Sequence, residues 1–369
     1  MMCYLCGSRK YTEILNKNEV AIWTSMGSNP NDKEMKHKCI IVQCKECGHL
    51  YQPVNKKLSS MLKEIYTSEN AQASTPTGKG NWGRERAKRL LDKMKVKSFK
   101  SVIEIGCADG HILKLLKSMG VKKLVGIDPS IKKTEERNGI LYFKAFAHGN
   151  FRLSQKYELI FSSAVFEHIK DINSIMRFCR NNLEENGRLF FSVPNAQKDL
   201  EHGDPGIFLH QHVHYFTERS LNYLLRKNGL EIRSLEATDD SLNVVARKNS
   251  RYVTKLPEPI FYDDYQNKLN KVLVKTEAIL KRRRVMVHGV GSGLNNILGW
   301  LHKQFNFVLA DNDIHKQGRR YFGKIVKSLK DIELSKYDTV LITTFPFFEE
   351  ISSQYINMGF KGEFENSVA

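Results

Sequence analysis

From residue 99 onward, short apolar runs alternate with amphipathic segments. The apolar runs predict strands at Ser101–Ile105, Leu124–Ile127, Leu141–Phe146, Leu159–Ser163 and Arg188–Val193. Apolar residues spaced three and four apart predict helices at His111–Met119, Ile172–Leu183 and Ser220–Lys227. Two further β segments, Leu230–Ala237 and Leu242–Arg247, follow the last helix. This alternation predicts an α/β fold with a doubly wound, mostly parallel sheet, an antiparallel edge hairpin and helices on both faces.

The flanking sequence has different patterns. The first segment is short, strand-like and turn-rich, and the next has a helical period that a Gly/Ser/Thr/Pro stretch interrupts at Ser74–Gly83. After the central domain, a proline-containing linker turns helical, and a second α/β pattern begins with an apolar strand at Val285–His288. The predicted organisation is a small N-terminal domain at 1–56, a helical connector at 57–98, an α/β domain at 99–250, a linker helix at 251–284 and a Rossmann-like α/β domain at 285–369.

Length and charge narrow the choice of protein class. The 369-residue chain has no apolar run long enough for a transmembrane helix, and Met1–Cys6 lacks the features of a signal peptide, so we expect a cytoplasmic protein without membrane insertion. The net charge of +18 is spread along the chain, whereas a nucleic-acid footprint is normally concentrated on one stripe. Arg84–Arg89 and Lys281–Arg284 are the best candidates for functional basicity, and solvated helix faces would explain both equally well.

Four of the seven cysteines form two C-x-x-C-G units, Cys3-x-x-Cys6-Gly7 and Cys44-x-x-Cys47-Gly48. In a reducing compartment, paired units of this kind indicate metal binding more than disulfides. Two such turns complete a tetrahedral tetrathiolate site, which suits zinc and leaves no vacancy for catalysis. The sequence therefore predicts a structural zinc site, with a set of free thiols as the alternative.

The strongest candidate for a ligand site is the turn after the first predicted strand. Val102–Ile105 leads into a G-x-x-x-G turn at Gly106 and Gly110 and then into an amphipathic helix. A pyrophosphate-binding turn would have a third glycine, whereas Asp109 here repels phosphate and suits a ligand with an amino group and a sulfonium. Asp128 ends the next strand, at the position expected to hold ribose hydroxyls.

Taken together, these motifs are similar to those of a known enzyme family. Residues 99–250 resemble a class I S-adenosylmethionine-dependent methyltransferase, and the whole chain resembles the three-part sugar methyltransferases, which have an N-terminal zinc-binding domain and a C-terminal Rossmann-like domain. The resemblance rests on the cysteine pairs, on Val102–Gly110, on Ser163–Asp171 and on His210–Phe216. It implies a set of cofactor contacts: Glu104, Gly106, Cys107, Asp109 and Gly110 to the methionine moiety, Asp128 to the ribose, Ala147 and His148 near adenine, and Ser163 on the pocket floor.

A group of histidines follows the fifth predicted strand, namely His202, His210, His212 and His214. Histidine is the natural base near neutral pH when a hydroxyl or C–H acceptor must lose a proton. The related C-methyltransferases carry a Tyr-His-Glu-His run here, but this chain has Gln211 in place of the glutamate. Since Gln211 cannot accept a proton, we predict O-methylation with His212 as base and keep C-methylation as an alternative.

Three other groups are candidates near the acceptor. His210 is a second candidate base, and Glu167 with His168 could form another acid–base pair, although loop packing would also explain each histidine. Tyr66, ahead of the Ser74–Gly83 stretch, is expected to close over the substrate.

The C-terminal domain contains a second glycine-rich turn, His288–Gly293, followed by Asp311 at the end of the next strand. The domain has room for only half of a dinucleotide fold, so we expect it to hold the nucleotide part of an activated sugar or to serve in packing. Arg319 and Arg320 are candidate phosphate contacts, with solvation as the alternative.

The predicted function is methylation of a nucleotide-linked sugar or a glycan precursor. An RNA methyltransferase whose zinc domain grips nucleic acid is the first alternative, although no basic stripe interleaved with aromatic residues supports it. A zinc-stapled binding module without enzymatic activity is the second.

Overall fold

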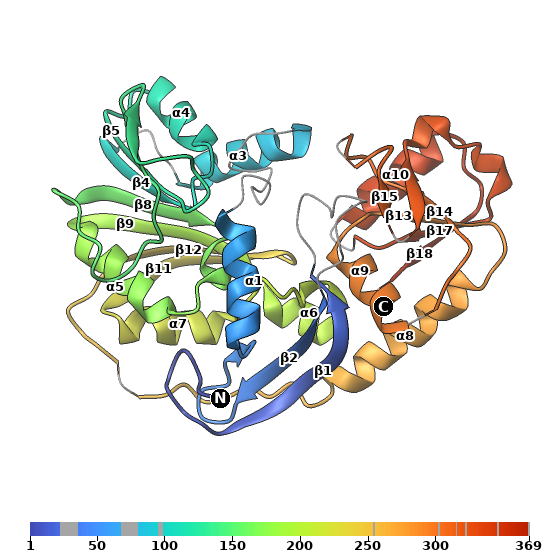
Figure 1. Ribbon diagram of the computed structural model, residues 1–369, viewed down its shortest axis with the longest axis horizontal. Coiled ribbons are helices and arrows are strands. Elements are labelled where there is room, and N and C mark those ends of the chain that lie inside the picture. The colour runs from blue at the N-terminus through green and yellow to red at the C-terminus, as the bar shows by residue number, and fades with distance from the viewer. Residues whose placement is uncertain are drawn as a thin grey trace. The chain divides into compact units, whose positions relative to one another are not determined.

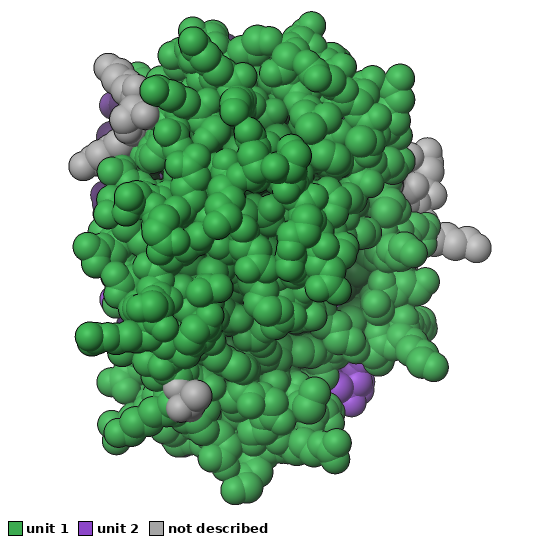
Figure 2. Space-filling model, turned by 90° about the vertical axis from the view of Figure 1, so that its left-hand side faces the viewer, with its two compact units in different colours: residues 1–12, 42–195, 211–261 green, residues 13–41, 196–210, 262–369 purple. Residues whose placement is uncertain are grey.

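The computed structural model describes residues 1–22, 36–67, 80–94, 99–253, 255–301, 303–314, 316–321, 323–344 and 347–367. These residues form two compact units, coloured separately in Figure 2. The first unit comprises residues 1–12, 42–195 and 211–261, and the second comprises 13–41, 196–210 and 262–369. No helix among the described residues has the length and apolar character that crossing a membrane requires.

The first unit is built on an eight-stranded sheet with the order β11-β12-β9-β8-β4-β5-β7-β6. Its strands are β4 (Ser101–Ile105), β5 (Lys123–Ile127), β6 (Glu135–Arg137), β7 (Ile140–Phe143), β8 (Tyr157–Ser163), β9 (Leu183–Pro194), β11 (Leu230–Ala237) and β12 (Ser241–Lys248). The run from β9 to β7 is parallel, whereas β11, β12 and β6 pair antiparallel with their neighbours. The prediction of a mostly parallel sheet with an antiparallel edge hairpin is confirmed.

Helices cover both faces of this sheet (Figure 1). The helices of the first unit are α1 (Lys56–Thr67), α3 (Gly80–Met94), α4 (His111–Ser118), α5 (Ile172–Asn182) and α7 (Glu218–Lys227). On the face that α3 and α4 cover, Leu90 and Leu113 join a buried cluster with Val102 and Phe161 from the strands. Apolar packing of this kind supplies most of the stability of short helices. Local signals mark the helix starts, because Asp171 caps α5 and Thr217 begins a capping box on α7.

A four-stranded sheet has the order β1-β2-β3-β10. Its strands are β1 (Tyr11–Ala21), β2 (Lys36–Cys44), β3 (Leu50–Tyr51) and β10 (His214–Tyr215). Within the first unit, β3 pairs antiparallel with β10, with Tyr51 opposite His214 and Leu50 opposite Tyr215. This pairing was not predicted, and it joins the N-terminal segment to the segment that carries the candidate catalytic histidines.

The second unit contains a six-stranded sheet with the order β15-β16-β14-β13-β17-β18. Its strands are β13 (Val285–His288), β14 (Val308–Ala310), β15 (Arg320–Tyr321), β16 (Lys324–Lys327), β17 (Thr339–Ile342) and β18 (Glu363–Asn366), and its helices are α6 (Ala196–His202), α8 (Tyr265–Leu280), α9 (Ser292–Leu301) and α10 (Phe348–Asn357). The strands from β16 to β18 are parallel, and two buried apolar clusters pack around β13 and β17. The predicted second α/β pattern is present, with additional short strands at the edges of its sheet.

Candidate active site and metal centre

The turn between β4 and α4 has a backbone that requires glycine at two positions. Gly106 and Gly110 have φ angles of +80° and +77°, in the left-handed region that side chains disfavour. A Cβ atom on Gly106 would lie 2.2 Å from Cγ2 of Val165, and one on Gly110 would lie 2.3 Å from the hydroxyl of Tyr142. The turn is therefore a tight backbone cradle at the carboxyl end of β4, where α/β sheets place their ligands.

Asp128 ties this turn to the end of β5. Its Oδ2 accepts a hydrogen bond of 2.8 Å from the amide of Ala108, and its Oδ1 accepts from the amide and the hydroxyl of Ser130 at 2.8 and 2.6 Å. Asp128 thus shapes the turn, and its role as a ribose ligand stays a prediction. Each carboxylate oxygen can accept more than one hydrogen bond, so these contacts leave acceptor capacity.

Glu104 is the buried carboxyl group of this site. Its side chain is 2% exposed, and its Oε2 has no hydrogen-bond partner among the residues that the structure describes. Burial raises the pKa of Glu104 well above its usual range, and the nearby Asp128 and Asp109 raise it further. A buried carboxylate without a partner is costly, so a cationic ligand group would find a favourable position here.

The other predicted cofactor residues lie around the same strand ends. The thiol of Cys107 is fully buried in the core, so only its backbone faces the turn, where its carbonyl accepts from Gly110. Ala147 and His148 lie in the loop after β7, and Ser163 ends β8 with a hydroxyl that has no hydrogen-bond partner within the described ranges. Asp109 is partly exposed, and its Oδ2 lies 3.8 Å from Nζ of Lys114. Direct contacts from these residues to a cofactor stay predictions.

The structure brings Glu167, His168 and His212 together, although 44 residues separate His168 from His212 along the chain. One ligating atom from each of the three lies within 4.8 Å of the others. Glu167 is 1% exposed, its carboxylate has no hydrogen-bond partner in the part of the chain described, and Oε1 lies 3.7 Å from Nε2 of His168. Burial raises the pKa of Glu167, while nearby His168 and Arg86 oppose the shift. The arrangement can therefore hold and pass a proton.

Hydrogen bonds fix the orientation of His168. Its Nδ1 lies 2.8 Å from the carbonyl of Gln211, and because a carbonyl only accepts, Nδ1 carries the proton. A neutral His168 thus presents an unprotonated Nε2 toward Glu167. The hydroxyl of Tyr66 donates to the same carbonyl at 3.1 Å. Tyr66 therefore supports the histidine segment, and its predicted role over the substrate stays a prediction.

The other histidines of the group lie elsewhere. His210 belongs to the second unit, where its Nε2 donates to the carbonyl of His37 at 2.9 Å and burial lowers its pKa to about 4. His214 is buried in the first unit, and its Nε2 donates to the carbonyl of Ile169 at 3.0 Å. Its Nδ1 lies 2.9 Å from Nε2 of His49. His214 thus serves in packing, and a catalytic role for His210 stays a prediction. Sequence reasoning missed His49, because no local pattern indicates its partner.

The buried state of His214 predicts a pH-dependent stability. Burial lowers its folded pKa to about 4, while an unfolded histidine titrates near 6.5. Between these values the unfolded chain binds more protons, so the stabilisation is complete above pH 6.5 and is lost as the pH falls toward 4. From pH 7.5 to 5, His214→Gln should lose about 2 kcal/mol less free energy of unfolding in urea than the wild type. His202→Gln, on α6, is the control and should keep the pH dependence of the wild type. If His214→Gln also kept it, the burial of His214 would not be the cause of the pH-dependent stability.

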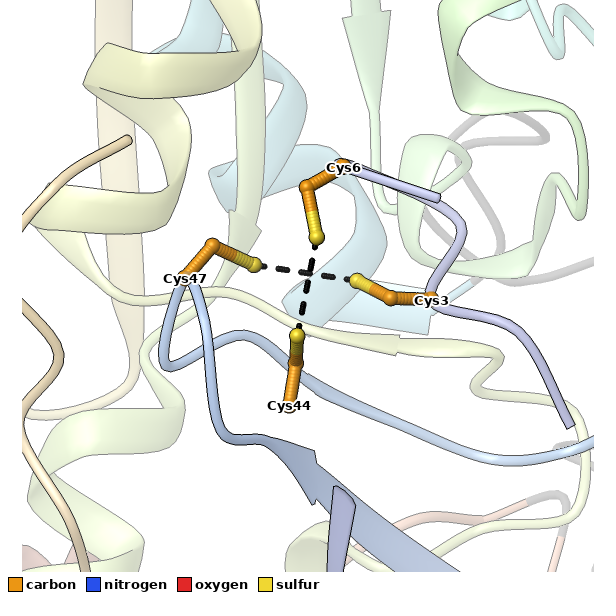
Figure 3. Close-up of side chains that lie close together, drawn as sticks. All are labelled: Cys3, Cys6, Cys44 and Cys47. Atoms are coloured by element: carbon orange, nitrogen blue, oxygen red, sulfur yellow. Dashed lines mark hydrogen bonds between the residues drawn. The ribbon is translucent and has the colours of Figure 1, made fainter. Parts of the chain in front are cut away.

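The four paired cysteines converge on one point (Figure 3). The Sγ atoms of Cys3 and Cys47 are 3.7 Å apart, and those of Cys6 and Cys44 are 3.5 Å apart. A disulfide would bring the sulfur atoms to about 2.05 Å, whereas a tetrahedral ion with metal–sulfur bonds of about 2.3 Å separates them by about 3.8 Å. Both the donor set and the spacing therefore fit a tetrahedral zinc ion.

The two cysteine turns have the same backbone bonds. The amides of Gly7 and Gly48 each donate at 2.9 Å to the carbonyl of the first cysteine, and both glycines have positive φ. The first turn is anchored on two helices of the first unit, because Asn173 of α5 donates to the carbonyl of Tyr4 and Lys227 of α7 donates to that of Leu5. The repeated C-x-x-C-G motif thus produces two matching half-sites.

The glycine-rich turn of the second unit repeats the bonding of the first. The amide of Val290 donates to Oδ2 of Asp311 at 2.7 Å, as Ala108 does to Asp128. Here, however, Lys316 pairs with Asp311 at 3.1 Å, and Asn296 of α9 donates to the carbonyls of Pro205 and Phe208. Asp311, the counterpart of Asp128, is therefore already paired with Lys316, and a nucleotide contact stays a prediction. Arg319 directly precedes β15 and Arg320 is its first residue, whose guanidinium donates to the carbonyl of Gly323.

Two family models match the chain. Residues 80–235 match a family described as a methyltransferase domain, which spans α3 through most of β11. Residues 281–363 match a second family, described as C2185-like, N-terminal. The predicted methyltransferase domain is thereby confirmed.

Relatives and solved structures match parts of the chain. The tRNA U34 carboxymethyltransferase of Campylobacter hominis is 24% identical over 28% of this chain and 39% of its own length, and the C-methyltransferase NovU of Streptomyces niveus is 26% identical over 37% of this chain and 34% of its own. The match therefore spans under two-fifths of either relative. Two crystal structures are also similar to parts of this chain. One, of an S-adenosylmethionine dependent methyltransferase from Mesorhizobium loti, has 19% sequence identity and a TM-score of 0.37, and the match covers 44% of this chain and 98% of that one. The other, of an N-methyltransferase from Bradyrhizobium japonicum with S-adenosylhomocysteine, has 17% identity and a TM-score of 0.38, and the match covers 52% of this chain and 98% of that one.

Proposed function

We propose that this chain, whose residues 80–235 are a methyltransferase domain, transfers a methyl group from S-adenosylmethionine to a hydroxyl of a sugar, either nucleotide-linked or part of a glycan precursor. The observation that carries the proposal is the buried Glu104 beside the glycine turn. An unpartnered carboxylate oxygen matches an ammonium or sulfonium cation, and the glycine turn lies at the carboxyl end of β4, where α/β sheets place their ligands.

The fit of the cofactor can be tested at Gly106. In Gly106→Ala, the left-handed φ and the 2.2 Å approach to Val165 should displace the turn and weaken binding of S-adenosylhomocysteine by at least about tenfold. Titration calorimetry measures this change. Gly120→Ala is the matched control, because Gly120 also has a positive φ but nothing lies within 4 Å of its added Cβ. Equal affinity in Gly106→Ala and the control would place the cofactor elsewhere.

S-adenosylmethionine supplies a methyl group activated by a sulfonium, and its transfer is an in-line displacement. The chain's part is to align the acceptor hydroxyl and to remove its proton. We assign the base to His212, which lies in the cluster with His168 and the buried Glu167. Glu167, with its raised pKa, and the oriented Nε2 of His168 form a second proton-holding pair beside it.

The acceptor assignment rests on Gln211. The backbone carbonyl of Gln211 accepts hydrogen bonds from Tyr66 and His168, and its amide side chain offers no base for generating a carbanion. A hydroxyl acceptor needs a single base, which His212 can supply. C-methylation is the alternative, since one similar relative is named a C-methyltransferase.

We also propose that Cys3, Cys6, Cys44 and Cys47 hold a structural zinc ion. Four thiolate donors complete the coordination shell, so this ion would take no part in the reaction. Its effect would be to hold the two cysteine turns of the N-terminal segment against each other.

Titration calorimetry with S-adenosylmethionine tests whether the chain binds this cofactor, and absence of binding would contradict the proposal. Acceptors can be found by incubating the full chain with methyl-deuterated S-adenosylmethionine and a panel of nucleotide-linked hexoses, with mass spectrometry of the products. Label on a sugar oxygen supports the proposal, while label on a sugar carbon identifies the C-methylation alternative. Transfer confined to tRNA, which one relative's name mentions, would replace the sugar by RNA.

A further inference from the structure

The segment that carries His212 is held by the strand that leaves the second cysteine turn. Gln52, directly after β3, uses two donors on this segment: its amide nitrogen bonds the carbonyl of Val213 at 2.9 Å, and its side-chain Nε2 bonds the carbonyl of His212 at 3.0 Å. Gln52 is 1% exposed, so water does not compete with these bonds. All of these residues belong to the first unit.

Hydrogen bonds also hold the opposite side of the segment. The carbonyl of Gln211 accepts from His168 and Tyr66, and the amide of Val213 donates to the carbonyl of Glu167 at 2.7 Å. Backbone groups from 211 to 213 are therefore fixed between the Glu167–His168 pair on one side and Gln52 on the other. On its side of the segment, Gln52 donates to the carbonyls of both Val213 and His212, so it holds the backbone on either side of the His212 side chain.

A second link runs parallel to the first. His49 follows Gly48 of the cysteine turn, and its Nε2 lies 2.9 Å from Nδ1 of His214, whose Nε2 bonds the carbonyl of Ile169. This buried chain joins the metal turn to the residue immediately after His168. The cysteine turn thus has a hydrogen-bonded connection to each side of the candidate catalytic cluster.

We propose that Gln52 is a positioning residue that holds His212 in register for proton removal, and that the cysteine-turn segment acts in catalysis through it. This inference rests on the proposed function. A side chain at 212 that is free to shift would lose alignment with the acceptor, and misplacement by about 1 Å costs up to about a hundredfold in rate. Cofactor binding, which depends on the ends of β4 and β5, should be unaffected.

The test compares Gln52→Met with Gln43→Met. Gln43 is a matched control in the same segment: it is fully buried, and its Nε2 donates at 2.9 Å to the carbonyl of Gly48 and at 2.6 Å to that of Ile260, not to the histidine segment. Both changes keep the side-chain shape and remove a buried amide, so a merely structural effect should appear in both. Zinc content is measured in each variant, and one equivalent is expected.

Two readouts decide the outcome. Ring resonances of His212 in histidine-labelled full chain, assigned with His212→Ala, should move in Gln52→Met and stay in Gln43→Met. With the acceptor found in the sugar panel, kcat should fall about tenfold in Gln52→Met, with little change in the affinity for S-adenosylmethionine. Unmoved His212 signals in Gln52→Met, or equal losses in both variants, would overturn the inference. The resonance comparison needs no acceptor, so it stands even if the proposed methyl transfer fails.

Discussion

Replacing His212 with alanine is expected to lower the rate of methyl transfer by about 10²–10⁴-fold, the usual contribution of a positioned general base. The proton of the acceptor hydroxyl would then have no acceptor at this position in the cluster. Binding of S-adenosylmethionine should persist, because the proposed cofactor turn lies at the ends of β4 and β5, away from the segment that carries His212. The measurements are kcat with the identified acceptor and the cofactor affinity by calorimetry.

A matched change at His202 is the control. His202 belongs to the same histidine-rich stretch of sequence but lies on α6 in the second unit. His202→Ala should therefore retain full activity. Added imidazole should restore part of the activity of His212→Ala, since it can take the proton in place of the missing ring. Full activity in His212→Ala would exclude His212 as the base and would direct attention to the Glu167–His168 pair.

Removing one thiolate from the metal centre should have the second large effect. Cys44→Ser is expected to lose the zinc ion and to lower the free energy of unfolding by several kcal/mol, because metal binding is coupled to folding in small sites of this type. The loss should spread to the candidate active site, since β3 and β10 pair directly after the second cysteine turn. Elemental analysis and thermal unfolding measure the two effects.

Cys39→Ser is the control for this change. Cys39 is as buried as Cys44 and lies on the same strand, β2, but is not part of the cysteine cluster. Its replacement should leave one equivalent of zinc bound, and its cost should be limited to burying a hydroxyl. If Cys44→Ser retained a full equivalent of zinc and unchanged stability, the four cysteines would be free thiols, as the alternative from the sequence holds.

Most of the parallel sheet was predictable because its strands are buried on both faces. Ser101–Ile105 is buried throughout and matches its predicted bounds, and β8 and β9 contain their predicted apolar runs. The strands that were not predicted, such as Glu135–Arg137, Lys324–Lys327 and Glu363–Asn366, lie toward the edges of their sheets and contain charged residues. Such short strands lack a periodic apolar signal, and only the neighbouring strand defines them.

By itself, the sequence determined the local chemistry of this protein. The C-x-x-C-G repeats specify two turns that direct thiols inward, and the glycines at 106 and 110 specify a backbone that only glycine adopts without strain. These features depend on residues a few positions apart, so a linear pattern contains them. Asp128 is a partial case, because its distance along the chain was expected, whereas its bond to Ala108 required the parallel pairing of β4 and β5.

Only the tertiary structure decided which of the histidines lies beside Glu167 and His168. The sequence offers His212 as the first candidate base and His210 as the second, and nothing in the linear pattern shows that they belong to different compact units or that His212 joins Glu167 and His168. The bonds from Gln52 to His212 and from His49 to His214 cross 160 and 165 residues. Apolar periodicity indicates which side of a strand is buried but not which distant strand it meets. The link between the cysteine turns and the histidine segment exists only after β3 and β10 have paired.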